Sequence, residues 1–105
     1  MKVFLSGPVS GVENYERVFE VAESLLTAEG HDVCNPAREF RKWTDYEDIM
    51  KACLERITAS EVVVMLPGWQ QSRGANREYG FALGRGIKIV PLYDREGRER
   101  SCLQN

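Results

Sequence analysis

No long hydrophobic run occurs in this chain of 105 residues. The apolar residues at its start give way to Ser6, which makes the run too short for a signal peptide, and no stretch approaches the roughly 20 apolar residues of a membrane span. The three cysteines, Cys34, Cys53 and Cys102, form no C-x-x-C pair and lack metal-ligand spacing. An odd set of this kind is typical of a reducing compartment, so we expect a cytoplasmic protein without a membrane partner.

An excess of positive charge is also absent. The chain has 14 Lys and Arg against 16 Asp and Glu, which gives a net charge of −2 at pH 7. Sequence-independent nucleic-acid binding needs a basic surface, so we expect no nucleic-acid partner. The single histidine, His31, lies in a Gly-His-Asp turn that favours a structural role. The acids Asp45, Glu47 and Asp48 open a predicted helix, where they suit the helix dipole, and we expect no bound metal.

The two common nucleotide-binding signatures, G-x-x-x-x-G-K and G-x-G-x-x-G, are missing as well. Their absence argues against ATP and NAD, and we expect no cofactor. Hydrophobic residues make up 43% of the chain and charged residues 29%, as in an ordinary folded globular protein. This length supports one hydrophobic core, so we expect a single domain over residues 1–105.

Apolar patterns alternate between strands and helices along the chain. Strands are predicted at residues 2–6, 32–34, 61–66 and 87–92. Helices are predicted from residue 15 until Gly30, at 45–58 and at 73–85, with a polar, aromatic-bearing connection up to Trp43. Strands separated by helices pair in parallel, so we expect an α/β fold, a small doubly wound sheet of four to five strands. The polar tail from Tyr93 is either loose or in contact with a neighbouring subunit.

Three strand ends are expected to meet at one edge of this sheet. Glycines there let the backbone approach a ligand closely, and hydroxyl groups beside helix N-termini suit an anion. An ordinary turn without a ligand remains the alternative. The segments are Ser6-Gly7-Pro8-Val9-Ser10-Gly11, Asn35-Pro36, and Pro67-Gly68-Trp69 with Ser72-Arg73-Gly74.

Glu78 stands in the third predicted helix on the same stripe as Ala75 and Ala82. Its carboxylate is therefore expected to point with the small apolar residues, toward a cleft, where it is a candidate catalyst. The alternative is a glutamate on a solvated helix face, which is common because glutamate is a good helix former.

Taken together, several short motifs resemble the nucleoside 2-deoxyribosyltransferase-like superfamily, most closely its short phage and bacterial branch. The resemblance covers residues from Lys2 to about Leu92. It implies a flavodoxin-like fold and cleavage of an N-glycosidic bond between a nucleobase and a sugar. The motifs are Phe4-Leu5-Ser6-Gly7-Pro8, Gly30-His31-Asp32-Val33 with Asn35-Pro36, Leu66-Pro67-Gly68-Trp69, Ser72-Arg73-Gly74-Ala75, and Glu78.

The resemblance implies that Glu78 attacks the anomeric carbon, after which water or a second base takes the sugar. An early position in a helix is expected to favour its ionised form. Ser72 matches a position that is serine in the nucleotide-cleaving members, which implies a nucleoside 5′-monophosphate beside Arg73; a plain helix N-cap is compatible with that role. Trp69, with Trp43 as a second candidate, is expected to stack on the base or to fill the core. The predicted substrate-binding residues are Ser6, Gly7, Pro8, Gly11, Asn35, Pro67, Gly68, Trp69, Ser72 and Gly74.

Cys53 departs from the pattern. Many active relatives carry an aspartate there that handles the proton of the leaving base, whereas a thiol is a poor donor to a base nitrogen. Two interpretations follow: an N-glycosidase or deoxyribosyltransferase in which Cys53 occupies the catalytic position, or a nucleotide-binding protein that has lost turnover. Cys53 as packed core is a third possibility. Relatives complete their pocket with a neighbour's residues, so a homodimer or larger homo-oligomer is expected.

Overall fold

The computed structural model describes residues 1–93, which form one parallel sheet with helices on both faces. The strands are β1 (Lys2–Ser6), β2 (Asp32–Cys34), β3 (Val62–Met65) and β4 (Lys88–Pro91). They lie in the order β2-β1-β3-β4, and every neighbouring pair is parallel. The predicted doubly wound α/β fold is confirmed, with four strands within the described part. The prediction made for the tail beyond Tyr93 lies outside the described residues.

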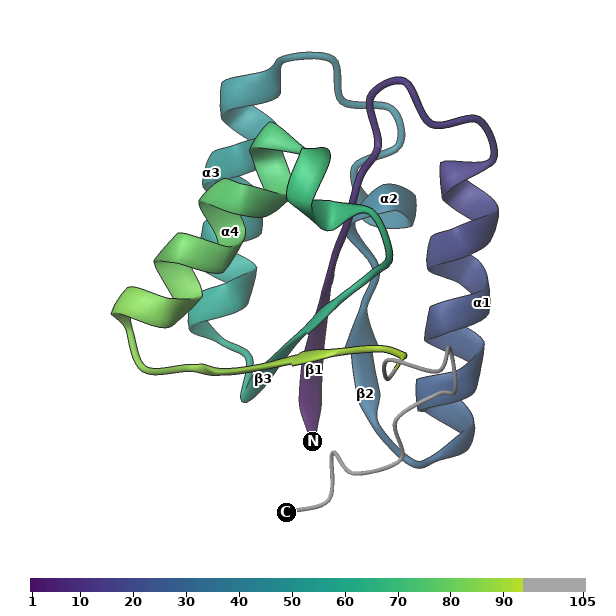
Figure 1. The fold of residues 1–105 in the computed structure, drawn as a ribbon, viewed down its shortest axis with the longest axis vertical. Coiled ribbons are helices and arrows are strands. Elements are labelled where there is room, and N and C mark those ends of the chain that lie inside the picture. Colours follow the sequence, from purple (N-terminus) through teal and green to yellow (C-terminus); the bar gives the residue numbers. More distant parts are fainter. Residues whose placement is uncertain (94–105) are drawn as a thin grey trace.

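The long helices divide between the two faces of the sheet (Figure 1). Helix α1 (Tyr15–Ala28) covers one face, and α3 (Tyr46–Thr58) and α4 (Arg73–Gly84) cover the other. The central strands β1 and β3 are buried on both faces because their residues alternate between two cores. Val3 and Leu5 pack toward α1, whereas Phe4 packs toward α3 and α4.

A short helix, α2 (Pro36–Glu39), occupies part of the segment predicted as a connection. That prediction is wrong for these four residues. The local signal is clear in retrospect, because the Asn35 side chain accepts a hydrogen bond from the Arg38 amide and Pro36 takes the first helical position. The helix is too short to show a 3.6-residue apolar period, so pattern analysis misses it. A second short element, the 3₁₀ turn Trp69–Gln71, follows β3.

The chain changes direction across the sheet between β1 and β3. After β1 it passes to α1 on one face, and after β3 it passes to α4 on the other face. The two loops therefore diverge and leave a crevice beyond the carboxyl ends of these central strands, where doubly wound folds bind ligands. Gly7 permits the close approach of the two strand ends, since a Cβ there would lie 2.8 Å from Leu66 Cβ.

Within the described residues, no helix is both long and apolar enough to cross a membrane.

Candidate active site

A cleft of about 1020 Å³ opens at this crevice. Its walls come from the loop after β1, from the segment around α2, from the inner side of α3, and from the loop and first turns that lead into α4. Elements far apart in the sequence thus meet at one place. The cleft is lined by nine of the predicted site residues: Gly7, Pro8, Gly11, Cys53, Pro67, Gly68, Ser72, Gly74 and Glu78.

Glu78 is a buried carboxyl group in the wall of this cleft. It lies on the buried stripe of α4 with Ala75 and Ala82, as the sequence pattern predicts, and only 6% of its surface is exposed. The Ser6 hydroxyl, at the end of β1, donates a 2.6 Å hydrogen bond to Glu78 Oε1. Ser6 itself is buried behind the cleft and supports Glu78.

The environment of Glu78 opposes its ionisation. Burial raises the pKa of this carboxyl from 4.5 to about 7, although the hydrogen bond from Ser6, the nearby Cys53 thiol and the positive charge of Arg77 lower it. We expected the position in the helix to favour the ionised form of Glu78. That expectation is wrong, because the pKa of this carboxyl is raised overall. Desolvation outweighs the helix dipole, whose effect at a helix end is worth about 1 kcal/mol or less at exposed sites.

Cys53 lies against this carboxylate from α3. The thiol is 2% exposed and lies close enough to Glu78 for each group to shift the pKa of the other. Burial, and then the nearby Glu78 charge, raise the pKa of Cys53, so the thiol stays protonated. The structure thus places the Ser6 hydroxyl and the Cys53 thiol beside one acid.

The loops beside α4 carry features suited to an anion. Ser72 caps α4, with its hydroxyl oxygen accepting a 3.1 Å hydrogen bond from the Ala75 amide. The first amides of the helix point toward its N-terminal end, where anions are favoured. Gly68 adopts a left-handed φ of 83° that allows the turn after β3. The Arg73 guanidinium, also in the cleft wall, stacks 4.4 Å from the Tyr46 ring centroid.

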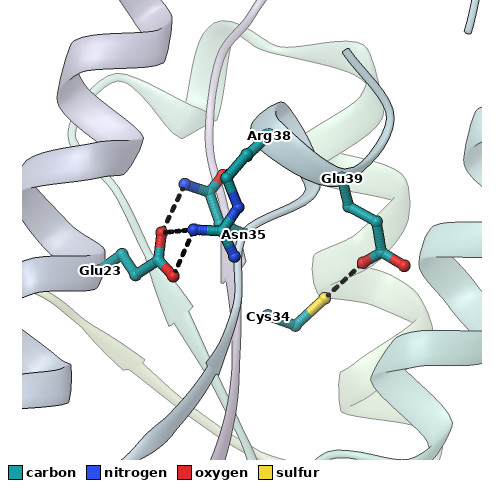
Figure 2. Close-up of polar contacts among 5 residues, drawn as sticks. All are labelled: Glu23, Cys34, Asn35, Arg38 and Glu39. Atoms are coloured by element: carbon teal, nitrogen blue, oxygen red, sulfur yellow. Dashed lines mark hydrogen bonds and ion pairs between the residues drawn. The ribbon is translucent and has the colours of Figure 1, made fainter. Parts of the chain in front are cut away.

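Asn35 lies at the N-terminus of α2, is buried, and does not line the cleft. Its Nδ2 donates a 3.1 Å hydrogen bond to Glu23 Oε1, and its Oδ1 accepts one of 3.2 Å from the Arg38 amide (Figure 2). Arg38 in turn donates two hydrogen bonds of 2.7 Å to the Glu23 carboxylate. Asn35 therefore positions α2 against α1, and the next residues, Pro36 and Ala37, line the cleft.

The two tryptophans occupy different hollows. Trp69 stacks on Tyr79, with ring centroids 4.8 Å apart, in a second hollow of about 470 Å³. Trp43 lines the cleft, is 48% exposed, and contacts Phe40 with centroids 4.7 Å apart. The structure thus brings the second candidate, Trp43, to the cleft and leaves Trp69 outside it. Sequence reasoning also missed Arg41, although Phe40-Arg41-Lys42-Trp43 follows a predicted strand end.

In the described part of the chain, the charged side chains that line the cleft are two arginines and one glutamate. Within residues 1–93, its lining contains Arg41 and Arg73 as cations and Glu78 as the only carboxyl group. In the same part of the chain, no group of three or more His, Cys, Asp and Glu side chains is placed to hold a metal ion. The site therefore offers one buried acid and positive charge at its edges.

The chain shares its fold with a solved 2-deoxyribosyltransferase. The chain is similar to the solved structure of a 2-deoxyribosyltransferase from the psychrotolerant bacterium Bacillus psychrosaccharolyticus, with a TM-score of 0.70 and 19% sequence identity over 87% of this chain and 71% of that one. Residues 1–91 match the family model described as Domain of unknown function (DUF4406), and the chain belongs to this family. No curated protein sequence matches the chain. The predicted flavodoxin-like fold is confirmed by this structural similarity, and the family match agrees with the predicted branch of unknown function.

Proposed function

We propose that this protein cleaves the base–sugar bond of a (deoxy)nucleoside 5′-monophosphate through a covalent glutamyl–sugar intermediate. The product sugar passes to water, as in an N-glycosidase, or to a second base, as in a deoxyribosyltransferase. The observation that carries the proposal is Glu78, a buried carboxyl group held by the Ser6 hydroxyl in the wall of a nucleotide-sized cleft. Its position at the crevice between β1 and β3 supports a role in ligand chemistry.

In the first step, a Glu78 oxygen bonds to the anomeric carbon while the base departs with the electrons of the broken bond. In the second step, water or a second base attacks the same carbon and releases the carboxylate. With a pKa of about 7, a substantial fraction of Glu78 is ionised at neutral pH and able to attack. Its burial excludes water from the carboxylate, which strengthens its interaction with the positive charge that develops on the sugar.

The 5′-phosphate is proposed to bind between residues 7–11 and the start of α4. Ser72 is neutral, so it does not repel a phosphate as an acid would. The helix N-terminus and Arg73 supply positive potential on the same side. We also propose that a second copy of the chain completes the open cleft; light scattering that finds a monomer at assay concentration would count against this.

Release of free base is the direct test. Liquid chromatography would measure it from ribo- and 2′-deoxynucleoside 5′-monophosphates, for wild type, Glu78→Gln and the exposed control Glu55→Gln. We expect release by wild type and by the control, and its loss in Glu78→Gln with nucleotide binding retained. Equal release by Glu78→Gln contradicts the assignment. Absence of release by folded wild type, with binding intact, points instead to a nucleotide-binding protein without turnover. Addition of a second free base separates transfer from hydrolysis.

A further inference from the structure

The aromatic end of the cleft carries a cation without a protein partner among residues 1–93. Arg41 lies in the sequence between Phe40 and Trp43, and all three line the cleft. Two neighbouring arginines form ion pairs within the protein. Arg38 pairs with Glu23 on α1, and Arg56 pairs with Glu39 on α2. Within the described chain, the Arg41 guanidinium donates no hydrogen bond, forms no ion pair and stacks on no aromatic ring, unlike Arg38 and Arg56. It is free to bind a ligand.

The segment that carries Arg41 is fixed on both sides. The Glu23–Arg38 pair ties α2 to α1, and the Arg56 Nε donates a 3.0 Å hydrogen bond to Glu39 Oε2, which ties α2 to α3 (Figure 2 shows Glu23, Arg38 and Glu39). Phe40, immediately after α2, is 5% exposed and anchors the chain in the core. Arg41 therefore extends from a rigid base, which limits the positions that its guanidinium can reach.

Within the described residues, the same cleft contains hydroxyl groups but few side chains acidic enough near neutral pH to protonate a leaving base. Among its lining residues within positions 1–93, Glu78 is the only carboxyl group and no histidine is present. Cys53 is only 2% exposed beside Glu78, and the raised pKa of its thiol makes it a weak acid. A base that departs without a proton carries negative charge, so positive charge near the base is needed to stabilise it.

We propose that Arg41 binds the O6/N7 edge of a 6-oxopurine and thereby selects guanine- or hypoxanthine-type nucleotides; this inference rests on the proposed function. As Glu78 bonds to the anomeric carbon, the C1′–N9 electron pair moves into the purine. The base leaves as an anion, its charge is shared with O6 and N7, and it later takes a proton from water. Arginine donates two parallel hydrogen bonds to this edge. Adenine presents an amino donor there, which cannot accept from the guanidinium.

Binding of two nucleotides tests the assignment. Calorimetry would compare 2′-deoxyguanosine and 2′-deoxyadenosine 5′-monophosphate on wild type, Arg41→Ala, Arg41→Lys and the adjacent exposed control Lys42→Ala. We expect wild type and the control to prefer the guanine nucleotide by about 5- to 150-fold. Arg41→Ala is expected to reduce this preference to about twofold or less, and Arg41→Lys, which lacks the paired donors, to an intermediate value.

The outcomes separate this inference from the proposed function. A preference that survives in Arg41→Ala overturns the inference, and so does an equal loss for both nucleotides, which would assign Arg41 to the phosphate. If binding shows the Arg41-dependent preference but wild type releases no base, the proposed function fails and the base contact stands. If release depends on Glu78 but the preference ignores Arg41, the inference alone fails. Absence of binding by either nucleotide overturns both.

Discussion

Burial of Glu78 predicts that this protein becomes less stable as the pH rises. In the unfolded chain the carboxyl has its ordinary pKa of 4.5, whereas in the folded chain the pKa is about 7. The folded state therefore holds the proton more tightly. Below pH 4.5 both states are protonated and Glu78 has no ionisation cost. As the pH rises from 4.5 to 7, the unfolded chain loses this proton before the folded chain does, so the free energy of unfolding falls. Above pH 7 both states are ionised and the free energy of unfolding falls no further on account of Glu78.

The size of the effect follows from the two pKa values. Each pH unit between them is worth about 1.4 kcal/mol, so the free energy of unfolding falls by about 3 kcal/mol in total. Glutamine has nearly the same shape, keeps an oxygen that accepts from Ser6, and does not ionise. Glu78→Gln is therefore expected to be more stable than wild type at pH 8, by about 2–3 kcal/mol more than at pH 5.

Urea unfolding at pH 5 and pH 8 measures this difference. Comparing the variant with wild type at each pH removes the contributions of all other titrating groups. Glu55→Gln changes an exposed glutamate on α3, so its difference in stability from wild type is expected to be the same at pH 5 and pH 8. If Glu78→Gln gains no stability over wild type between pH 5 and pH 8, then burial does not raise the pKa of Glu78 and the description of the site as desolvated is wrong.

Three further predictions test the chemistry and the packing of the site. Base release is expected to increase with pH through about 7, because only ionised Glu78 attacks; a rate that is flat from pH 5 to 8 would argue against a nucleophile with this pKa. Ser6→Ala removes the 2.6 Å donor, so the pKa of Glu78 should rise further and the midpoint of the pH–rate profile should move upward; an unchanged midpoint contradicts the role given to Ser6. Gly7→Ala places a methyl group 2.8 Å from Leu66 Cβ and should lower the free energy of unfolding by about 1–3 kcal/mol in urea titrations. Its control, Gly80→Ala, meets no atom within 4 Å in an exposed helical position and should be neutral or stabilise by up to about 1 kcal/mol; the reverse order would refute the packing argument.

The sequence predicts the order of strands and helices well because each has a strong local signal. The bounds of β1 are predicted correctly from its apolar run, and α4 is predicted to within one residue at each end. The inward direction of Glu78 also follows locally, from its spacing to Ala75 and Ala82. These features depend on periodicity over a few turns, which a single sequence contains.

The parts that were missed depend on contacts distant in the sequence. The Asn35 side chain is held at the N-terminus of α2 by a hydrogen bond to Glu23, which lies 12 positions earlier on another helix. The short 3₁₀ turn after β3 directs Trp69 to the outer hollow and against Tyr79, and no local pattern signals that direction. The pKa of Glu78 depends on how completely the surrounding elements exclude water from it. Spacing along one helix predicts the direction of the side chain but not its desolvation.

The instability that Glu78 introduces is itself an argument for chemistry at this position. Its neighbours on the buried stripe of α4, Ala75 and Ala82, are apolar and carry no ionisation cost. A residue that only packed against β1 would be better served by another small apolar side chain. The carboxyl is instead met by the Ser6 hydroxyl and the Cys53 thiol, and both lower its pKa without abolishing the effect of burial. The two polar neighbours ease the ionisation of a buried acid, and they support the proposed role of its ionised form toward a substrate.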